Sequence, residues 1–456
     1  MRKIIVLAAL IVAFSSIPLF VGYKIQNGFE QQIASLNRLP GYSAEILEYN
    51  RGLFSATGKI NISFAMAPDS QSNAAHKAIA TTLNDGIKMD FNAQHGPLLF
   101  EPNLSVGLAH FTLTFSEDQV FTQQIKHELD IEQVFVAHLN MKLGGNGHAS
   151  VNVAPIEANE DNQSLSFGGL NIEYALGNYG ERYTLEGRIQ PLKILGEGFE
   201  VNSSPILLSG NGEGGDFFWG TGKASVTMDS FSIEGPSSLK ATGLALKLGV
   251  SRSGDDLMDI NYTFSLDTLS SSAISGKVND SVLNITLANI KQSTLKALSE
   301  ATNGFSPDTA PFLAEKQAEL QSLTGEILAE SPKMIIEHLA FNLDEDTFLD
   351  LKGELGINAD LISDPSAVMG NPYMLIPTID SHMNARFSKS FVTIMLSQYM
   401  GSQMEAGADQ AQKTNDMIEQ FVQSGFLIKY SGGYKMEASF RAAQFMINGK
   451  AMPLPL

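Results

Sequence analysis

The sequence predicts a mainly β protein, α+β overall, that begins with a single transmembrane helix. An uncharged apolar run opens the chain, strand-like alternation fills its middle, and helical periodicity enters after Ile290. Alternation with period two indicates half-buried strands, and strands separated by turn residues are typical of antiparallel sheets. We therefore expect a transmembrane anchor over 1–24, a large antiparallel β-rich domain over 25–290 and an α+β domain over 291–456.

The apolar run Ile4–Tyr23 is long enough to cross a membrane. At about 1.5 Å per residue it extends roughly 30 Å, the thickness of a hydrocarbon core. Arg2 and Lys3 precede it, and positive charge favours a cytoplasmic amino terminus. A cleaved signal peptide is the alternative, since Ala13-Phe14-Ser15 is similar to a cleavage site. The run continues past this point and exceeds the usual apolar region of about 7–15 residues, so we expect the segment to be retained.

Composition narrows the classes of partner and chemistry. The chain has 49 acidic and 30 basic residues, a net charge of −19. Such a chain repels phosphate backbones, which argues against a nucleic-acid partner. It contains no cysteine, so disulfides, thiolate catalysis, zinc–thiolate sites and iron–sulfur clusters are excluded. The absence of cysteine agrees with an exported location.

The expected elements follow from periodicity. A juxtamembrane helix over Lys24–Leu36 is expected to pack its apolar stripe on the first strands. Alternation predicts strands around Ile60–Met66, Ile87–Phe91, Leu139–Leu143, Leu170–Tyr174, Val226–Met228, Leu244–Val250, Ile260–Leu266, Leu283–Leu287, Ile335–Phe341, Phe348–Ile357 and Ile379–Phe387, a hairpin of Phe426–Tyr430 with Tyr434–Phe440, and a last strand near Phe445–Ile447. Helices are expected over Ser293–Thr302, from Asp308 or Thr309 to Ala329, and over Phe391–Tyr399 and Ala411–Val422.

Three short motifs carry a resemblance to a known family. They are the run Tyr49–Ser55 (YNRGLFS), His95-Gly96-Pro97 just after a predicted strand, and Phe445–Lys450 (FMINGK) near the end. Together with the anchor, they resemble the YdgA-like family of bacterial inner-membrane-anchored envelope proteins of unknown function. The resemblance implies a single-pass protein of the inner membrane, with its amino terminus in the cytoplasm and its bulk in the periplasm. It implies no reaction.

The first candidate site is Arg51-Gly52-x-Phe54. Glycine suits a tight or left-handed turn, and the arginine side chain can bind an anion or a carboxylate. The alternative is a turn leading into the first strand, with Arg51 in a structural ion pair. We favour the structural interpretation, because a single arginine does not make a phosphate site.

The second candidate site is His95-Gly96-Pro97, which would present an imidazole on a rigid turn. Catalysis would require a nucleophile or carboxylate that the fold brings to it. The eight histidines are scattered, and no two have the spacing of metal ligands. We favour a structural loop histidine, and we predict no catalytic, cofactor-binding or metal-binding residues.

Three other patterns are weaker. The run 210–215 (GNGEGG) matches the dinucleotide pattern G-x-G-x-x-G, but Asp216-Phe217-Phe218 rather than a helix follows, which indicates a flexible turn. The acidic clusters Glu160-Asp161 and Asp344-Glu345-Asp346 lack calcium-loop spacing and indicate solvated loop tips. Ten of the seventeen methionines fall from Met369 onward, which favours adaptable core packing over copper binding.

These observations favour a membrane-anchored, non-enzymatic envelope scaffold or binding protein that needs no cofactor. One alternative is a lipid-binding or lipid-handling protein, because one-sided strands must either cover their apolar face or leave it open to acyl chains. A second alternative is a hydrolase with a site near His95. The expected partners are the membrane, through Ile4–Tyr23, and an envelope protein or lipid; a homo-oligomer is allowed.

Overall fold

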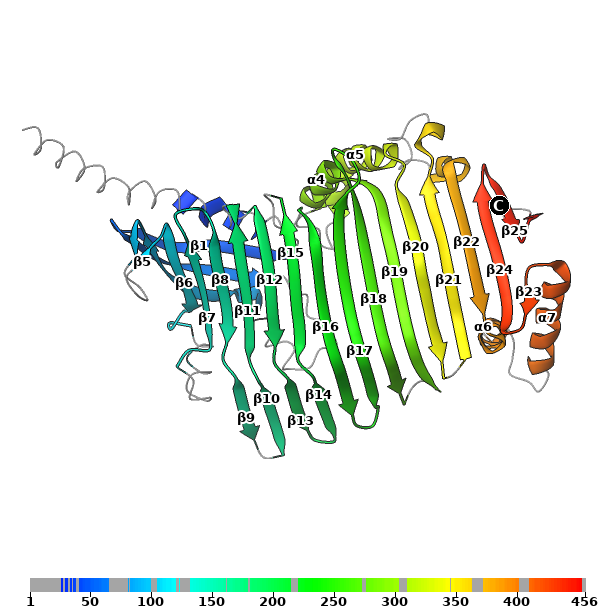
Figure 1. The fold of residues 1–456 in the computed structure, drawn as a ribbon, viewed down its shortest axis with the longest axis horizontal. Helices are drawn as coiled ribbons and strands as arrows, with labels where there is room; N and C mark the ends of the chain where they lie inside the picture. Colours follow the sequence, from blue (N-terminus) through cyan, green and yellow to red (C-terminus); the bar gives the residue numbers. More distant parts are fainter. Residues whose placement is uncertain are drawn as a thin grey trace, which may run out of the picture. The chain divides into compact units, whose positions relative to one another are not determined.

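The chain is a mainly β protein built from antiparallel strands (Figure 1). The computed structural model describes residues 26–452, apart from 28, 32, 35, 38–40, 65–80, 82, 100–104, 120–122, 124–131, 161, 179–180, 215–219, 273–275, 303–309, 345, 363–371 and 402–409. The predicted anchor Ile4–Tyr23 therefore lies outside the described residues. Within the described part, none of the helices combines the length and hydropathy that a membrane span requires.

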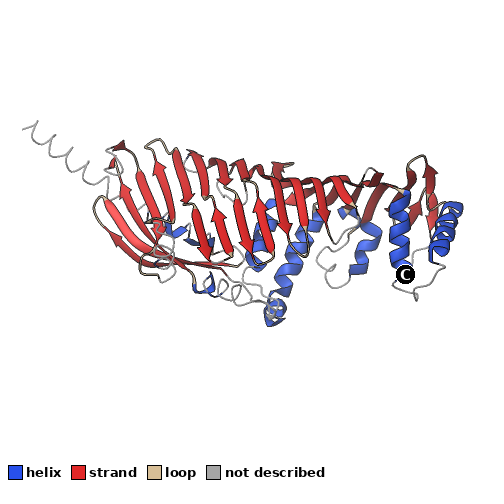
Figure 2. Cartoon of the chain, turned by 90° about the horizontal axis from the view of Figure 1, so that it is seen from below, coloured by secondary structure: helices blue, strands red, loops and turns tan. Residues whose placement is uncertain are grey.

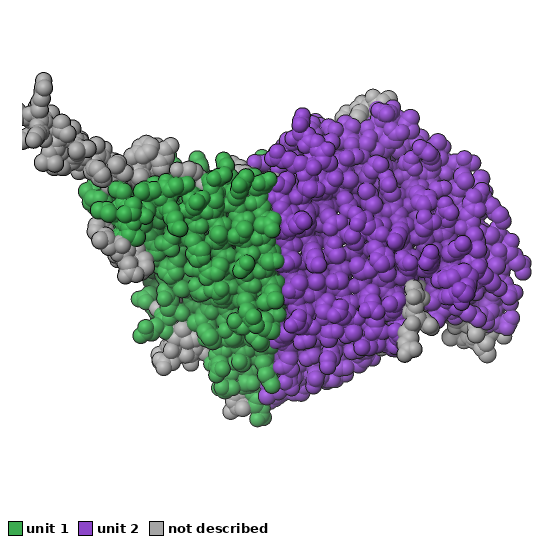
Figure 3. Space-filling view, viewed as in Figure 1, with its two compact units in different colours: residues 1–194, 205–220, 298–314 green, residues 195–204, 221–297, 315–456 purple. Residues whose placement is uncertain are grey.

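Contacts divide the chain into two compact units (Figure 3). Unit 1 comprises residues 1–194, 205–220 and 298–314, and unit 2 comprises 195–204, 221–297 and 315–456. The domain boundary predicted from the sequence lies near 290, where helices enter. Helix α4 does begin there, at Gln292, but contact between neighbouring strands divides the chain earlier.

Unit 1 is an antiparallel sheet in the order β1-β2-β3-β6-β7-β8-β11-β12-β15. Its strands are β1 (Tyr42–Arg51), β2 (Ser55–Phe64), β3 (Ile87–His95), β6 (Ala109–Phe115), β7 (Phe135–Met141), β8 (Gly147–Val153), β11 (Leu170–Gly177), β12 (Arg182–Ile189) and β15 (Ile206–Glu213). Smaller pairs are β4 (Leu98–Leu99) with β5 (Ser105–Val106) and β9 (Ile156–Glu160) with β10 (Gln163–Phe167), and β13 (Leu192–Gly196) follows β12.

A helix formed by the described residues between 26 and 36 packs on one face of the unit 1 sheet. The ring of Phe29 lies 5.0 Å from that of Phe91 and 6.5 Å from that of Phe111, measured between centroids. At the end of the helix, the Asn37 side chain exchanges hydrogen bonds with the Ala44 backbone N–H and C=O. The predicted packing of this helix on the first strands is confirmed.

Unit 2 is a second antiparallel ladder, β14-β16-β17-β18-β19-β20-β21-β22-β24-β25-β26, with β23 also paired to β24. Its strands are β14 (Phe199–Ser203), β16 (Thr221–Glu234), β17 (Leu239–Arg252), β18 (Leu257–Ser271), β19 (Lys277–Lys291), β20 (Lys333–Leu343), β21 (Asp346–Ile357), β22 (Ile379–Phe387), β23 (Ile428–Tyr430), β24 (Gly433–Arg441), β25 (Gln444–Ile447) and β26 (Lys450–Met452).

The helices follow the predicted positions. They are α4 (Gln292–Thr302), α5 (Ala310–Ala329), α6 (Lys389–Gly401) and α7 (Gln410–Ser424), with 3-10 turns at Ala359–Leu361 and Pro372–Thr378. In unit 2 the helices lie along one side of the strands (Figure 2). Helices α6 and α7 form a core with β24 around Val392, Ile418, Leu427 and Tyr434. The strands and helices predicted after residue 290 are confirmed.

The long strands β16–β19 change their alternation part-way along. In β16 the apolar positions shift from Val226 and Met228 to Phe231 and Ile233. Near the same level, Gly243 in β17 has a φ of +65° and Asp280 in β19 has a φ of +47°. A left-handed residue inside a strand locally disrupts the ladder, as in a β-bulge. The candidate site lies on the strand segments that are paired with the Val226 part of β16, and not on the segments paired with Phe231 and Ile233.

Candidate functional site

The two motifs singled out in the sequence meet at one end of unit 1. Arg51 is the last residue of β1, so the motif follows the first strand, and the prediction that it precedes the first strand is wrong. Residues 52–54 form the turn into β2, where the Gly52 N–H donates to the Ser55 carbonyl oxygen at 2.7 Å. The Phe54 carbonyl oxygen in turn accepts from the His95 N–H at 2.9 Å. The fold therefore joins motifs about forty residues apart.

Arg51 has a structural contact. Its side chain is exposed, and its Nη1 donates to Gln26 Oε1 at 3.3 Å, which ties the β1 end to the amino-terminal helix. Burial raises the pKa of the nearby Tyr49 hydroxyl, and the Arg51 charge acts in the opposite direction. A Cβ on Gly52 would lie 3.2 Å from the Ser55 carbonyl oxygen, and the residue has no left-handed φ. A glycine suits this position because the Ser55 carbonyl lies close to it, and not because the position requires a positive φ.

His95 is 1% exposed at the end of β3. The Gly96–Pro97 peptide that follows is cis. The Gly96 N–H donates to the Leu108 carbonyl oxygen at 2.8 Å, and Gly107 N–H donates to the Pro97 carbonyl oxygen at 3.1 Å. A substrate has no access to an imidazole buried to this extent, so the hydrolase alternative gains no support from its position. The described residues contain no group of three His, Cys, Asp or Glu side chains able to hold a metal ion.

Two other histidines, which spacing did not reveal, are brought together by strand pairing. His110 on β6 and His138 on β7 have ring centroids 5.8 Å apart, and Thr112 Oγ1 lies 3.2 Å from a ring nitrogen of each. His110 Nδ1 lies 2.5 Å from Asn140 Oδ1. Burial, and then the nearby His110, lower the pKa of His138. Only the register of β6 against β7 could have predicted this cluster.

Most of the segment that matches the G-x-G-x-x-G pattern forms a β-strand. Residues Gly210–Glu213 belong to β15, and Gly212 lies opposite Tyr183 on β12. A Cβ on Gly212 would lie 2.6 Å from the Tyr183 ring. The prediction of a flexible turn is wrong here, because the glycine makes room for an aromatic ring across the ladder. Backbone groups paired in a ladder are also not available to cradle phosphate.

The most extensive candidate site is one face of the unit 2 sheet, which we call the apolar face. Directly paired residues of neighbouring strands have side chains on the same side of a sheet. Register places three cross-strand rows on this face: Gly222, Val250, Ile260, Leu287, Met334, Leu355, Ser381, Phe440 and Phe445; Ala224, Leu248, Tyr262, Ile285, Ile336, Gly353, Met383, Ala438 and Ile447; and Val226, Leu246, Phe264, Leu283, Leu339, Leu351, Ala385 and Met436. None of these positions carries a charge.

Some large side chains on the apolar face are exposed to solvent, whereas Ile260 and Ile447 on the same face are each 8% exposed. Leu246 is 49% exposed, Tyr262 and Leu355 are each 42%, Val226 is 39% and Phe264 is 37%. Four of the five lie on the adjacent strands β16–β18. Contiguous exposed apolar surface is typical of surfaces that contact a protein, a membrane or a ligand.

The opposite face of the same strands is polar and internally hydrogen-bonded. Asn261 Nδ2 donates to Asn284 Oδ1 at 2.8 Å, and Asn284 Nδ2 donates to Glu337 Oε2 at 2.7 Å. Further along, Lys333 Nζ lies 2.8 Å from Glu354 Oε1. On β18–β21, these charged and hydrogen-bonded side chains therefore lie on the face opposite the apolar face.

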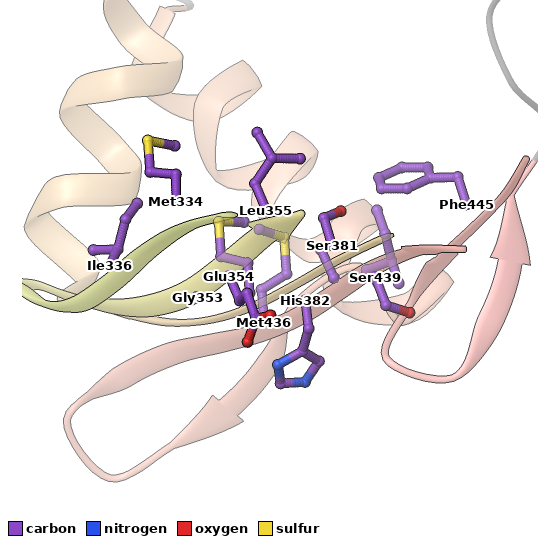
Figure 4. A pocket seen from close by; sticks show the side chains of 13 residues that line it. Met334, Ile336, Gly353, Glu354, Leu355, Ser381, His382, Met436, Ser439 and Phe445 are labelled. Atoms are coloured by element: carbon purple, nitrogen blue, oxygen red, sulfur yellow. The ribbon is translucent and has the colours of Figure 1, made fainter. Parts of the chain in front are cut away.

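The apolar face ends in a pocket of about 290 Å³ on strands β20, β21, β22, β24 and β25 (Figure 4). Met334, Leu355 and Phe445 stand on the pocket side of the strands, whereas the His382 ring points to the other side. Next to the pocket, Met436 packs against the core that α6 and α7 form, so these helices cover the β24 edge of the apolar face. Methionines in the lining agree with the predicted packing role of methionine.

The comparisons with known proteins give the family. A family model described as a bacterial protein of unknown function (DUF945) matches residues 1–455. The chain belongs to the DUF945 family. No curated protein and no solved structure matches it. The narrower assignment to a YdgA-like family stays a prediction, and the family description names no reaction, ligand or partner.

Proposed function

We propose that this DUF945 protein binds lipid acyl chains on the apolar face of unit 2 while Ile4–Tyr23 tethers it to the bacterial inner membrane, with its body in the periplasm. The observation that carries the proposal is the group of large apolar side chains on β16–β18 that stay exposed on a face without charges. The proposed role is non-enzymatic binding, the lipid form of the function expected from the sequence. The uncharged run Ile4–Tyr23 supports the tether.

The chemistry of the face favours an alkyl chain over an extended peptide. Strands β17–β22 each pair with a neighbour on both sides, so the sheet offers few backbone hydrogen bonds to an added strand. A peptide lying flat on this face would bury its own N–H and C=O groups without partners, which costs several kcal/mol per group. An acyl chain has no such groups to satisfy.

The dimensions also suit lipid. The large side chains that stay exposed lie between Val226 on β16 and Leu355 on β21, which gives five strand spacings of about 4.8 Å and a length of roughly 24 Å. A hydrocarbon core of about 30 Å contains two leaflets, so one acyl chain spans about 15 Å. The face can therefore hold a whole acyl chain, and each methylene that leaves water contributes about 0.8 kcal/mol.

Native mass spectrometry of the body starting at Lys24 tests this proposal, because removing the anchor removes its detergent-held lipid. We expect adducts of phospholipid mass on the wild-type body. The double change Leu246→Asp with Phe264→Asp places carboxylates on the face and should abolish the adducts. Both side chains are more than one-third exposed, so the variant should still fold.

Lys247→Asp is the matched control, since Lys247 is the exposed neighbour of Leu246 on the polar face. It should keep the adducts. A wild-type body without adducts, or adducts that persist in the double variant, would contradict lipid binding and leave the envelope-scaffold interpretation.

A further inference from the structure

Three connections lie together at one end of unit 1, and we call them the rim. They are the β1–β2 turn (52–54), the described parts of the β3–β6 connection (96–99 and 105–108) and the β7–β8 turn (142–146). Register places them at the same end, because His95 pairs with Ala109, Ala109 with Met141 and Met141 with Gly147. The hydrogen bond from the His95 N–H to the Phe54 carbonyl oxygen joins the first turn to this group.

The rim exposes large apolar side chains from all three connections. Val106 is 63% exposed, Leu98 and Leu143 are each 49%, Leu53 is 46% and Phe54 is 43%. Turns normally carry polar residues at their tips, because they face water. Five exposed apolar side chains at one end of one sheet therefore indicate a surface that meets something other than water.

The amino-terminal chain enters unit 1 at the rim. Gln26 accepts a hydrogen bond from Arg51 beside the β1–β2 turn, and Asn37 bonds to Ala44 near the other end of β1. The helix over 26–36 thus runs along β1 from the rim to the far end. Gln26 follows the end of the predicted anchor, Tyr23, by three residues, which reach at most about 11 Å in any conformation. If the proposed tether holds, the membrane surface lies close to the rim.

We infer that the rim docks on the lipid bilayer, with Leu53, Phe54, Leu98, Val106 and Leu143 inserted at the level of the headgroups. This inference rests on the proposed tether, and not on acyl-chain binding by unit 2. Charge supports a lipid surface, since Arg51 borders the rim, Lys142 belongs to it, and the described residues of the rim include no carboxylate. Basic residues beside apolar ones favour anionic headgroups.

This docking gives a role to both sequence motifs. The segment 51–54 supplies an arginine beside two exposed apolar side chains, and His95-Gly96-Pro97 starts the connection that carries Leu98 and Val106. A buried His95 and a close Gly96–Gly107 approach hold this connection against β6. In this interpretation, the two motifs hold the exposed apolar side chains of the membrane-contact surface in place.

Site-directed spin labelling of the full chain tests the inference. The sequence has no cysteine, so Phe54→Cys, Val106→Cys and Leu143→Cys each give a single labelling site. The full chain is reconstituted in nanodiscs of phosphatidylethanolamine and phosphatidylglycerol. Ser43→Cys is the matched control, because Ser43 is exposed near the opposite end of β1, roughly 27 Å from the rim at about 3.4 Å per residue.

We expect labels at 54, 106 and 143 to collide with oxygen more than with a water-soluble nickel complex, with a ratio several-fold above that at 43. Rim labels that match position 43, in protein that co-migrates with nanodiscs, would overturn the inference and leave the tether standing. Rim labels shielded from both reagents would also overturn it, because a protein partner would then cover the rim. Protein that fails to co-migrate would overturn both the tether and the inference.

Discussion

Gly96 occupies a position that no side chain fits. A Cβ there would lie 1.7 Å from the carbonyl oxygen of Gly107, a backbone atom that cannot move aside cheaply. Gly144 offers the contrast within the same unit, because a Cβ there would meet no atom within 4 Å. Both glycines lie in connections at the rim, so they differ in packing and not in location.

Gly96→Ala should lower the free energy of unfolding by roughly 1–3 kcal/mol, the usual cost of forcing extra atoms into a packed site. Gly144→Ala, the control, should stay within about 0.5 kcal/mol of the wild type. Denaturant unfolding followed by circular dichroism measures both. Equal stability of the two variants would show that the Gly96–Gly107 approach does not constrain the fold.

Only some of the features of single residues could be predicted from the sequence. It recognised the 51–54 and 95–97 segments as structural turns, because Gly and Pro are local signals. It did not predict the contact of Gly96 with Gly107, nor that residues 210–213 form a strand beside Tyr183. These outcomes depend on which strands become neighbours, which no local pattern encodes.

At the scale of elements, the pairing of β6 with β7 creates a titratable site from separated histidines. The pKa of His138 is lowered, first by burial and then by His110. In the unfolded chain, His138 has its ordinary pKa of 6.5. At a pH below this value, the unfolded chain therefore binds a proton at His138 more readily than the folded chain does. The free energy of unfolding is therefore unaffected well above pH 6.5 and falls as the pH drops below it.

His138→Gln should remove this source of acid sensitivity. Between about pH 7 and pH 5, the variant should lose less stability than the wild type, because glutamine takes up no proton. Denaturant unfolding at several pH values in this range provides the comparison. Parallel pH profiles for the two proteins would mean that burial of His138 is not linked to stability.

The strands and helices themselves were largely predictable. Alternation such as Ile60, Ile62 and Phe64 against Lys59 and Asn61 identifies β2, and the elements after residue 290 match their predicted ranges. The division into units was less accessible, since it depends on contacts between strands. The change of alternation near Gly243 was also missed, because it is a backbone feature shared by several neighbouring strands.

At the scale of the molecule, the sequence left open whether the apolar side of its sheets is covered. Unit 2 answers this for its own strands: helices α6 and α7 cover one edge, and β16–β18 keep Val226, Leu246, Tyr262 and Phe264 more than one-third exposed. Coverage is a tertiary property, so a one-sided strand has the same sequence in a closed sandwich and in an open ligand-binding sheet.

Photo-crosslinking in living cells tests acyl-chain binding most directly, because it uses the full chain in its own membrane. A benzophenone amino acid replaces Leu246 on the apolar face or, as the control, Lys247 on the opposite face. Mass spectrometry of the irradiated protein should find phospholipid-mass adducts at 246 and few at 247. Equal adducts at both positions, or a protein-mass crosslink at 246 in place of lipid, would contradict the proposal that the apolar face holds acyl chains.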